Sequence, residues 1–286
     1  LHVVVPNSLG IAGAVGTITF IGSWNAFLWP LLIAQDPALR TVQVTLAQFM
    51  TTQGIRYPEV FTGALVAVRK RFALIGLPVT LESRRDYREM LFRSKEAMTK
   101  YISGVILTEE TLEQDAKDGT PFRQILAEAD VIPGIKVDRG AFPMPGARDE
   151  KITEGLDGLR QRLKHYAELG AGFAKWRGVI AITNYAPSRN GIRANAHVLA
   201  RYAIHCQEAG IVPVVEPEVL ADGEPGDHSI QRCEEVTAET LEAVFKELRL
   251  AGVDLGGMLL KPNMVTPGLR SREHVSAEEI ARRTVD

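Results

Sequence analysis

The chain has 286 residues, of which 45% are hydrophobic and 24% are charged, as is ordinary for a globular protein with one large domain or two modest ones. Its formal net charge of −2 gives no support for a nucleic-acid-binding protein or for an acidic partner. The two cysteines are far apart and form no CxxC motif, which argues against a disulfide framework and favours reduced thiols in a cytoplasmic protein.

The N-terminal part of the chain is apolar and almost uncharged. No Asp, Glu, Lys or Arg occurs from Val3 to Ala34, and residues 11–33 provide the roughly 20 apolar residues that a bilayer-spanning helix needs. Trp24 and Trp29 lie toward one end, as in an interfacial aromatic belt. We expect residues 11–33 to be membrane-derived and to bring the chain to a membrane if they insert. A buried core helix or a pair of hydrophobic strands is the alternative.

Three stretches in this region resemble the C-terminal part of sugar-type ABC transporter permeases: FIGSWNAFLWPLLI (20–33), DPALRT (36–41) and LAQF (46–49). The similarity covers about residues 1–68, which we expect to form a hydrophobic helical segment distinct from residues 69–286. A permease also needs further helices and a coupling loop, so this segment alone cannot transport a solute. One interpretation of the whole chain is therefore a permease fragment joined to an inactive enzyme remnant.

From residue 69 onward, short apolar strands alternate with amphipathic helices, a pattern that predicts a parallel α/β fold. Apolar residues three and four apart predict helices at 82–101, 120–129, 153–169, 191–209, 237–250 and 276–284. Strands are predicted at 102–108, 134–138, 173–182, 211–219 and 257–265. Thr237 and Ser276 are predicted N-caps, and Gly170 and Gly210 are predicted to end helices in the left-handed conformation.

Polar side chains interrupt four of these strands, in pairs at alternate positions. The pairs are Lys136 and Asp138, Lys175 and Arg177, Glu216 and Glu218, and Lys261 and Asn263. Alternate residues of a strand share a face, so each pair points to one side. An open sheet covered by helices on both faces would bury these charges at a cost, whereas a closed barrel brings them together at its mouth. We therefore predict a functional cluster, with strand-end or surface positions as the alternative for individual pairs.

Lys261 is the most informative of these residues, because it lies inside the apolar run MLLKPNMV (258–265). Burying an unpaired lysine is costly. A desolvated lysine beside a second cation, here Lys175, loses its proton more readily and can attack a carbonyl carbon to form a Schiff base. The pattern therefore predicts a buried nucleophilic lysine.

Several motifs, in this order and at this spacing, resemble those of class I fructose-bisphosphate aldolases. They include YISGVIL (101–107), GIKVD (134–138), FAKWR (173–177), VEPE (215–218) and LLKPNMVTPG (259–268). The resemblance covers residues 69–286 and implies a (β/α)8 TIM barrel that reversibly cleaves fructose 1,6-bisphosphate to dihydroxyacetone phosphate and glyceraldehyde 3-phosphate in glycolysis. It implies a cytoplasmic enzyme that acts on a sugar phosphate, without a metal or a cofactor, and that is a homo-oligomer if the barrel is complete.

The resemblance also assigns roles to individual residues. Lys261 corresponds to the lysine that forms the imine, and Glu216 to the carboxylate that transfers protons as the carbinolamine loses water. The other assignments are Lys175 as an assisting cation, Glu218 as a neighbouring acid, Lys136, Asp138 and Arg177 on the side of the C6-phosphate, and Arg71 at the other phosphate. A bisphosphate needs cations at both ends.

The sequence departs from the family at both ends. No Asp occurs between Asp36 and Asp86, although the first strand of the family carries the aspartate that acts on the C4 hydroxyl. The seventh and eighth strands have no counterpart before Asp286. We therefore expect an incomplete barrel of five or six strands with little or no cleavage activity, in which Lys261 still forms some imine if the partial barrel folds.

The same residues argue against two other interpretations. A zinc-dependent aldolase would need clustered ligands, and the sequence contains no His-x-His or similar metal spacing. A catalytically dead barrel used for binding would not need Lys261, Glu216 and Lys175 together, and their presence argues against it.

Overall fold

The computed structural model describes residues 72, 76, 78–222 and 225–285. All of them belong to one unit, Tyr57–Asp286. The hydrophobic stretch at 11–33, the permease-like residues 1–68 and Arg71 lie outside the described residues, so what the sequence predicts for them stays a prediction. Of the helices in the described ranges, none combines the length and the apolar character that crossing a bilayer requires.

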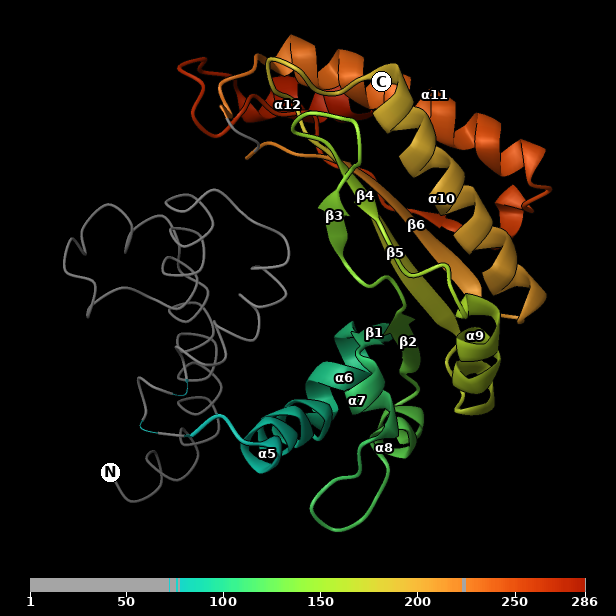
Figure 1. Cartoon of the computed structure of the whole chain (residues 1–286). Coiled ribbons are helices and arrows are strands. Elements are labelled where there is room, and N and C mark those ends of the chain that lie inside the picture. Colours follow the sequence, from blue (N-terminus) through green and yellow to red (C-terminus); the bar gives the residue numbers. More distant parts are fainter. Residues whose placement is uncertain (1–71, 73–75, 77, 223–224, 286) are drawn as a thin grey trace, which may run out of the picture. The chain divides into compact units, whose positions relative to one another are not determined.

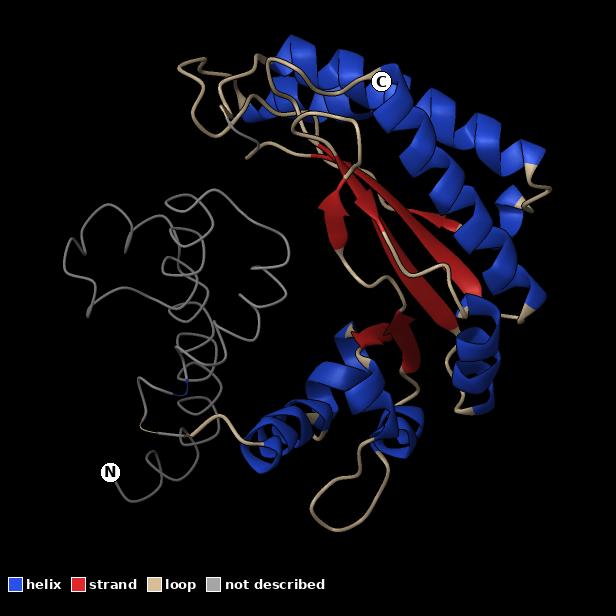
Figure 2. Ribbon diagram, in the orientation of Figure 1, coloured by secondary structure: helices blue, strands red, loops and turns tan. Residues whose placement is uncertain are grey.

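A sheet of five parallel strands forms the centre of this unit, which confirms the predicted parallel α/β fold (Figure 2). Its strands, in order across the sheet, are β1 (Gly104–Leu107), β2 (Ile132–Lys136), β5 (Phe173–Ile180), β6 (Val212–Val219) and β7 (Leu259–Leu260). The order across the sheet follows the order along the chain. Between β2 and β5 the chain makes an antiparallel hairpin from β3 (Ala141–Pro143) and β4 (Lys151–Thr153).

Helices connect the parallel strands, as parallel pairing requires. Their bounds are α5 (Leu81–Phe92), α6 (Lys95–Tyr101), α7 (Glu109–Glu113), α8 (Phe122–Glu128), α9 (Leu159–Glu168), α10 (Arg189–Glu208), α11 (Ile230–Leu250) and α12 (Ala277–Val285). Serine caps begin the two longest helices: Ser188 accepts a hydrogen bond from the Gly191 amide, and Ser229 accepts one from the Arg232 amide.

The core lies between the sheet and the helices on one of its faces. Helices α10 and α11 pack against each other, and both contact β6 (Figure 1). From β5, Ala174 and Trp176 point toward this layer and are fully buried, and the Trp176 ring packs on Tyr202 of α10. Burying a side chain such as Leu199, which is 1% exposed, contributes about 1.5–3 kcal/mol. Because Ala174 and Trp176 face the helices, the residues of β5 that alternate with them, such as Lys175 and Arg177, face the opposite side of the sheet.

Several predicted boundaries differ from the structure. The helix predicted at 82–101 is divided into α5 and α6, because the amide of Arg93 already closes the end of α5. The helix predicted from residue 153 begins at Leu159, because residues 151–153 pair in β4 and Gly155 has a φ of 124°. The predicted positive φ at the ends of two helices is confirmed, with 89° at Gly170 and 71° at Gly210.

Two further differences affect the site. The helix predicted to start at Thr237 starts at Ile230, because Ser229 provides the cap, so Thr237 lies inside α11 and is not an N-cap. The strand predicted at 257–265 is reduced to Leu259–Leu260. Pro262 lacks the backbone N–H that a longer ladder would need, and the preceding residues 255–257 form a turn of 3₁₀ helix.

Candidate active site

The predicted charged residues of β2, β5 and β6 meet on the face of the sheet that points away from α10. Strand register brings them together, since Lys136 is opposite Lys175 and Arg177 is opposite Glu216. Neighbouring residues in a ladder share a face, so the two charges of each of these pairs lie side by side. The prediction that separate strands point ionic side chains to one place is confirmed for these residues.

Glu216 lies at the centre of the cluster and contacts two lysines. The Lys175 Nζ is 2.5 Å from Glu216 Oε2, and the Lys261 Nζ donates to Glu216 Oε1. The Glu216 side chain is 5% exposed, so its negative charge is largely removed from water and depends on these cations. One carboxylate thus links β5, β6 and the end of β7.

The prediction that Lys261 is buried is wrong. Its side chain is 58% exposed, whereas that of Lys175 is 11% exposed. Lys175 lies in the middle of the sheet, with β2 on one side and β6 on the other, while Lys261 directly follows β7 at the edge of the described sheet. The arrangement therefore pairs a buried lysine with an exposed one through the same carboxylate.

Lys136 and Asp138 form a further ion pair of the site. The Lys136 Nζ lies 2.5 Å from Asp138 Oδ1, and the Gly140 amide donates to the same oxygen at 3.2 Å. Burial lowers the pKa of Lys136 below its ordinary value, Asp138 opposes this shift, and the cations Lys175 and Arg177 add to it. The alternative interpretation, in which these two residues form an ion pair on the protein surface, is wrong, because the side chains of Lys136 and Asp138 are only 12% and 4% exposed.

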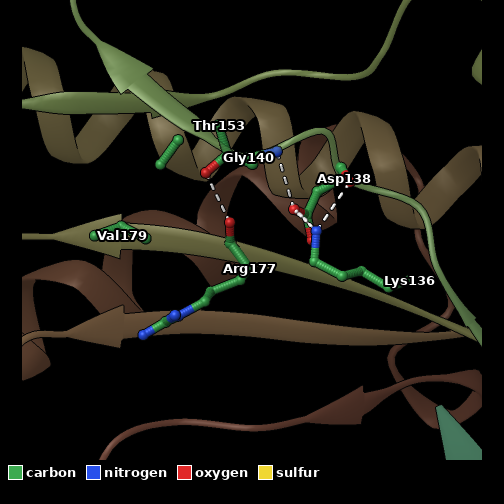
Figure 3. Close-up of a pocket in the computed structure, with 7 residues that line it drawn as sticks. Lys136, Asp138, Gly140, Thr153, Arg177 and Val179 are labelled. Atoms are coloured by element: carbon green, nitrogen blue, oxygen red, sulfur yellow. Dashed lines mark hydrogen bonds and ion pairs between the residues drawn. The ribbon is translucent and has the colours of Figure 1, made fainter. Parts of the chain in front are cut away.

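A small pocket lies beside this pair, with about 20 Å³ of room, enough for roughly one water molecule (Figure 3). It is lined by Lys136, Asp138, Gly140, Ala141, Thr153, Arg177 and Val179. Arg177 also forms an ion pair with Glu218 on β6. Figure 3 shows the Lys136 amine turned toward Asp138 and the Arg177 side chain extending away from them.

The β3–β4 hairpin contributes to the site, and sequence analysis did not predict it. Thr153 of β4 is buried and donates through Oγ1 to the carbonyl of Arg177 at 2.7 Å. The hairpin thereby covers the end of β5 next to the pocket. Pro145 and Gly146 lie in the turn between β3 and β4, and these turn residues were the available signal for a hairpin.

Asn263 does not point into the cluster, which corrects the prediction that it shares a face with Lys261. Its Oδ1 accepts from the Val219 amide at 3.0 Å, and its Nδ2 donates to Thr237 Oγ1 of α11 at 3.1 Å. Strand alternation does not apply beyond Leu260, where β7 ends. Within the part of the chain that the structure describes, no three His, Cys, Asp or Glu side chains are grouped so as to hold a metal ion.

Comparison with known proteins places these motifs in a family context. Residues 60–286 match the family model described as "Fructose-bisphosphate aldolase class-I". The chain is 51% identical over 218 residues to the "Probable fructose-bisphosphate aldolase class 1" of Xanthomonas campestris pv. campestris, covering 76% of this chain and 64% of that protein. The chain thus spans less than two thirds of the length of this relative.

Two other similarities extend this result. The "Fructose-bisphosphate aldolase C" of Carassius auratus is 46% identical over 257 residues, covering 88% of this chain and 69% of that protein. A solved structure of fructose-bisphosphate aldolase from Plasmodium falciparum, in complex with TRAP and a small-molecule inhibitor, matches with a TM-score of 0.72 and 46% identity, over 77% of this chain and 62% of that one. These matches give no support to the permease resemblance of residues 1–68.

Proposed function

We propose that the cluster of charged side chains on β2, β5 and β6 acts in the aldol cleavage of fructose 1,6-bisphosphate, because this chain belongs to the family of class I fructose-bisphosphate aldolases. The reaction is reversible and yields dihydroxyacetone phosphate and glyceraldehyde 3-phosphate, as a step of glycolysis. The observation that carries the proposal is the contact of the buried Glu216 with both Lys175 and Lys261.

The finer fold proposed for this reaction is an incomplete (β/α)8 barrel. Its support is the order of the five-stranded sheet, in which each strand lies beside the next strand of that sheet along the chain, with helices on one face and charges on the other. In such a barrel the charged face is the lumen, and the carboxyl ends of the strands form the mouth. Glu218 and Lys261, near the ends of β6 and β7, then lie at the mouth, where a substrate enters.

Lys261 is the proposed nucleophile, since its amine is exposed enough to meet a substrate. Glu216 takes a proton from the Lys261 ammonium, and the freed amine adds to the ketone carbon of the sugar to give a carbinolamine. Glu216 then gives this proton to the departing hydroxyl, which leaves as water. The resulting iminium accepts the electron pair of the C3–C4 bond when that bond breaks. The buried Lys175 cation holds Glu216 in place throughout. This chemistry requires no metal ion.

Lys136 and Arg177 are proposed to bind the phosphate at the far end of the sugar. Both are cations on the charged face, and each is oriented by a carboxylate, Asp138 for Lys136 and Glu218 for Arg177. Phosphate groups favour such donors because each carries nearly two negative charges. Arg71, proposed for the other phosphate, lies outside the described residues.

Borohydride trapping tests the proposal. Incubation with dihydroxyacetone phosphate and borohydride is expected to attach the reduced adduct to the peptide that contains Lys261, as detected by mass spectrometry. Lys261→Met should give no adduct, whereas Lys246→Met, which removes an exposed lysine of α11, should trap like the unchanged chain. Absence of an adduct on the Lys261 peptide of the unchanged chain would overturn the proposed function.

Cleavage of fructose 1,6-bisphosphate is a separate measurement with a different expected result. No residue of the sequence is assigned to remove the proton from the C4 hydroxyl, so imine formation is expected to proceed while cleavage is slow or absent. Turnover at rates typical of the family would contradict this expectation.

A further inference from the structure

The segment that carries Lys261 is only briefly part of the sheet. The ladder between β6 and β7 pairs Val214 with Leu259 and Val215 with Leu260. The Lys261 amide then donates to the Val215 carbonyl at 2.9 Å. Beyond that hydrogen bond, the described sheet has no strand beside the last residues of β6 on this side. The position of the Lys261 side chain therefore depends on what holds the residues after it.

The side chain of Asn263 provides the next attachment. Its Oδ1 accepts from the Val219 amide at the end of β6, where a longer β7 would have continued the ladder. Its Nδ2 donates to the hydroxyl of Thr237 in α11. Thr237 is only 7% exposed. A side-chain amide that bonds to a strand and to the helix covering it fixes the loop to both layers, and little water is present to compete.

The two attachments flank Glu216. On one side the Lys261 amide binds Val215, and on the other side Asn263 binds Val219. The Glu216 carboxylate emerges from the stretch of β6 between them and meets the Lys261 amine. We propose that Asn263, with Thr237 behind it, is a positioning residue that holds the Lys261 amine against Glu216. This inference rests on the proposed function of Lys261 as the residue that forms the imine.

Position matters here because the Lys261 side chain is 58% exposed and has little packing of its own to hold it. Imine formation needs the amine near a carbonyl carbon while the carboxylate is close enough to transfer a proton. A displacement of 1 Å in such an arrangement can cost about 100-fold in rate. The neutral amide of Asn263 takes no part in the proton transfers, so its effect is expected on the rate of the bound complex rather than on binding.

The chain offers a matched set of variants. Asn263→Ala removes both contacts, Thr237→Val removes the hydroxyl while keeping the shape of the side chain, and Thr237→Ser keeps the hydroxyl. Thr240→Val is the control. Thr240 is also buried in α11, at 3% exposed, and its hydroxyl has no hydrogen-bond partner among the described residues. Thr237→Val and Thr240→Val therefore make the same chemical change with and without loss of the contact.

The first measurement is the initial rate of borohydride-trapped adduct on the Lys261 peptide, over a range of dihydroxyacetone phosphate concentrations. Asn263→Ala is expected to lower the saturating rate about 100-fold, and Thr237→Val about 10-fold, with the half-saturating concentration changed less than about threefold. Thr237→Ser and Thr240→Val are expected to keep the rate of the unchanged chain. An unchanged rate in Asn263→Ala, or equal losses in Thr237→Val and Thr240→Val, would overturn the inference.

The second measurement does not depend on activity. Hydrogen exchange of the Lys261 and Val219 amides is expected to accelerate about tenfold or more in Asn263→Ala, but not in Thr240→Val, because only the former frees the segment. If the unchanged chain forms no adduct, the proposed function fails, and exchange alone decides the inference. Exchange of the Lys261 amide that is the same in Asn263→Ala as in the unchanged chain would then overturn it.

Discussion

Replacing Glu216 by glutamine is expected to destabilise the fold, because it leaves the Lys175 ammonium without a carboxylate. The two charged groups are 2.5 Å apart, and their side chains are 11% and 5% exposed. Removing one partner of a buried ion pair costs about 3–5 kcal/mol, since the remaining charge is left out of water. The glutamine oxygen still accepts one hydrogen bond, so we expect the lower end of this range, about 3 kcal/mol.

Urea unfolding by linear extrapolation measures this loss, and a thermal scan should show a decrease in Tm of about 6–12 °C. A double variant, Lys175→Met with Glu216→Gln, removes both charges and is expected to recover most of the stability lost in Glu216→Gln. Lys261→Met is the contrast, because that side chain is 58% exposed and Glu216 keeps Lys175 as its partner. It should cost less than about 1 kcal/mol.

Two results would refute this reasoning. One is a loss below about 1 kcal/mol for Glu216→Gln, which would mean that the Lys175 charge is not effectively buried. The other is a double variant whose loss equals the sum of the single losses, since additive effects indicate that the two groups do not interact.

Three further changes probe the parts of the fold that support the site. Burial lowers the pKa of His228, so this side chain binds more protons in the unfolded chain than in the folded one. The free energy of unfolding should therefore fall, relative to that of His228→Gln, as the pH drops below about 6.5. Equal dependence on pH in the two proteins would contradict this. In Gly134→Ala the new Cβ would lie 2.2 Å from the Phe173 ring, which predicts a loss of about 1–3 kcal/mol in urea unfolding, partly recovered by adding Phe173→Leu. In Tyr202→Phe the carbonyls of β5 and β6 lose their shared hydroxyl donor, and a loss of about 1–3 kcal/mol in the free energy of unfolding is expected.

The spacing of charges along the strands was sufficient to predict most of the site. A strand has a period of two, so Lys175 and Arg177, or Glu216 and Glu218, had to share a face wherever a strand formed. The apolar residues between them required the other face to be covered by helices. The parallel sheet followed from the same alternation of strands and helices. These features are local, and they do not depend on which segments become neighbours.

The hairpin β3–β4 and the helix start at Ser229 were missed for a different reason. Short strands carry a weak pattern, and their pairing is decided by contacts such as that of Thr153 with the Arg177 carbonyl. Thr237 followed by acidic residues has the composition of a helix cap, but a stronger cap upstream placed it inside the helix.

The residues of this chain, read alone, determined the sheet, the face that carries the charges and the motifs that assign the chain to its family. Only the tertiary structure decided which lysine is buried and what Asn263 contacts. Burial is set by the strands that lie on either side of a residue, and Lys175 has two such neighbours whereas Lys261 lies beyond the end of a two-residue edge strand. Neighbours of this kind come from distant parts of the chain, and no pattern within the segment itself encodes them.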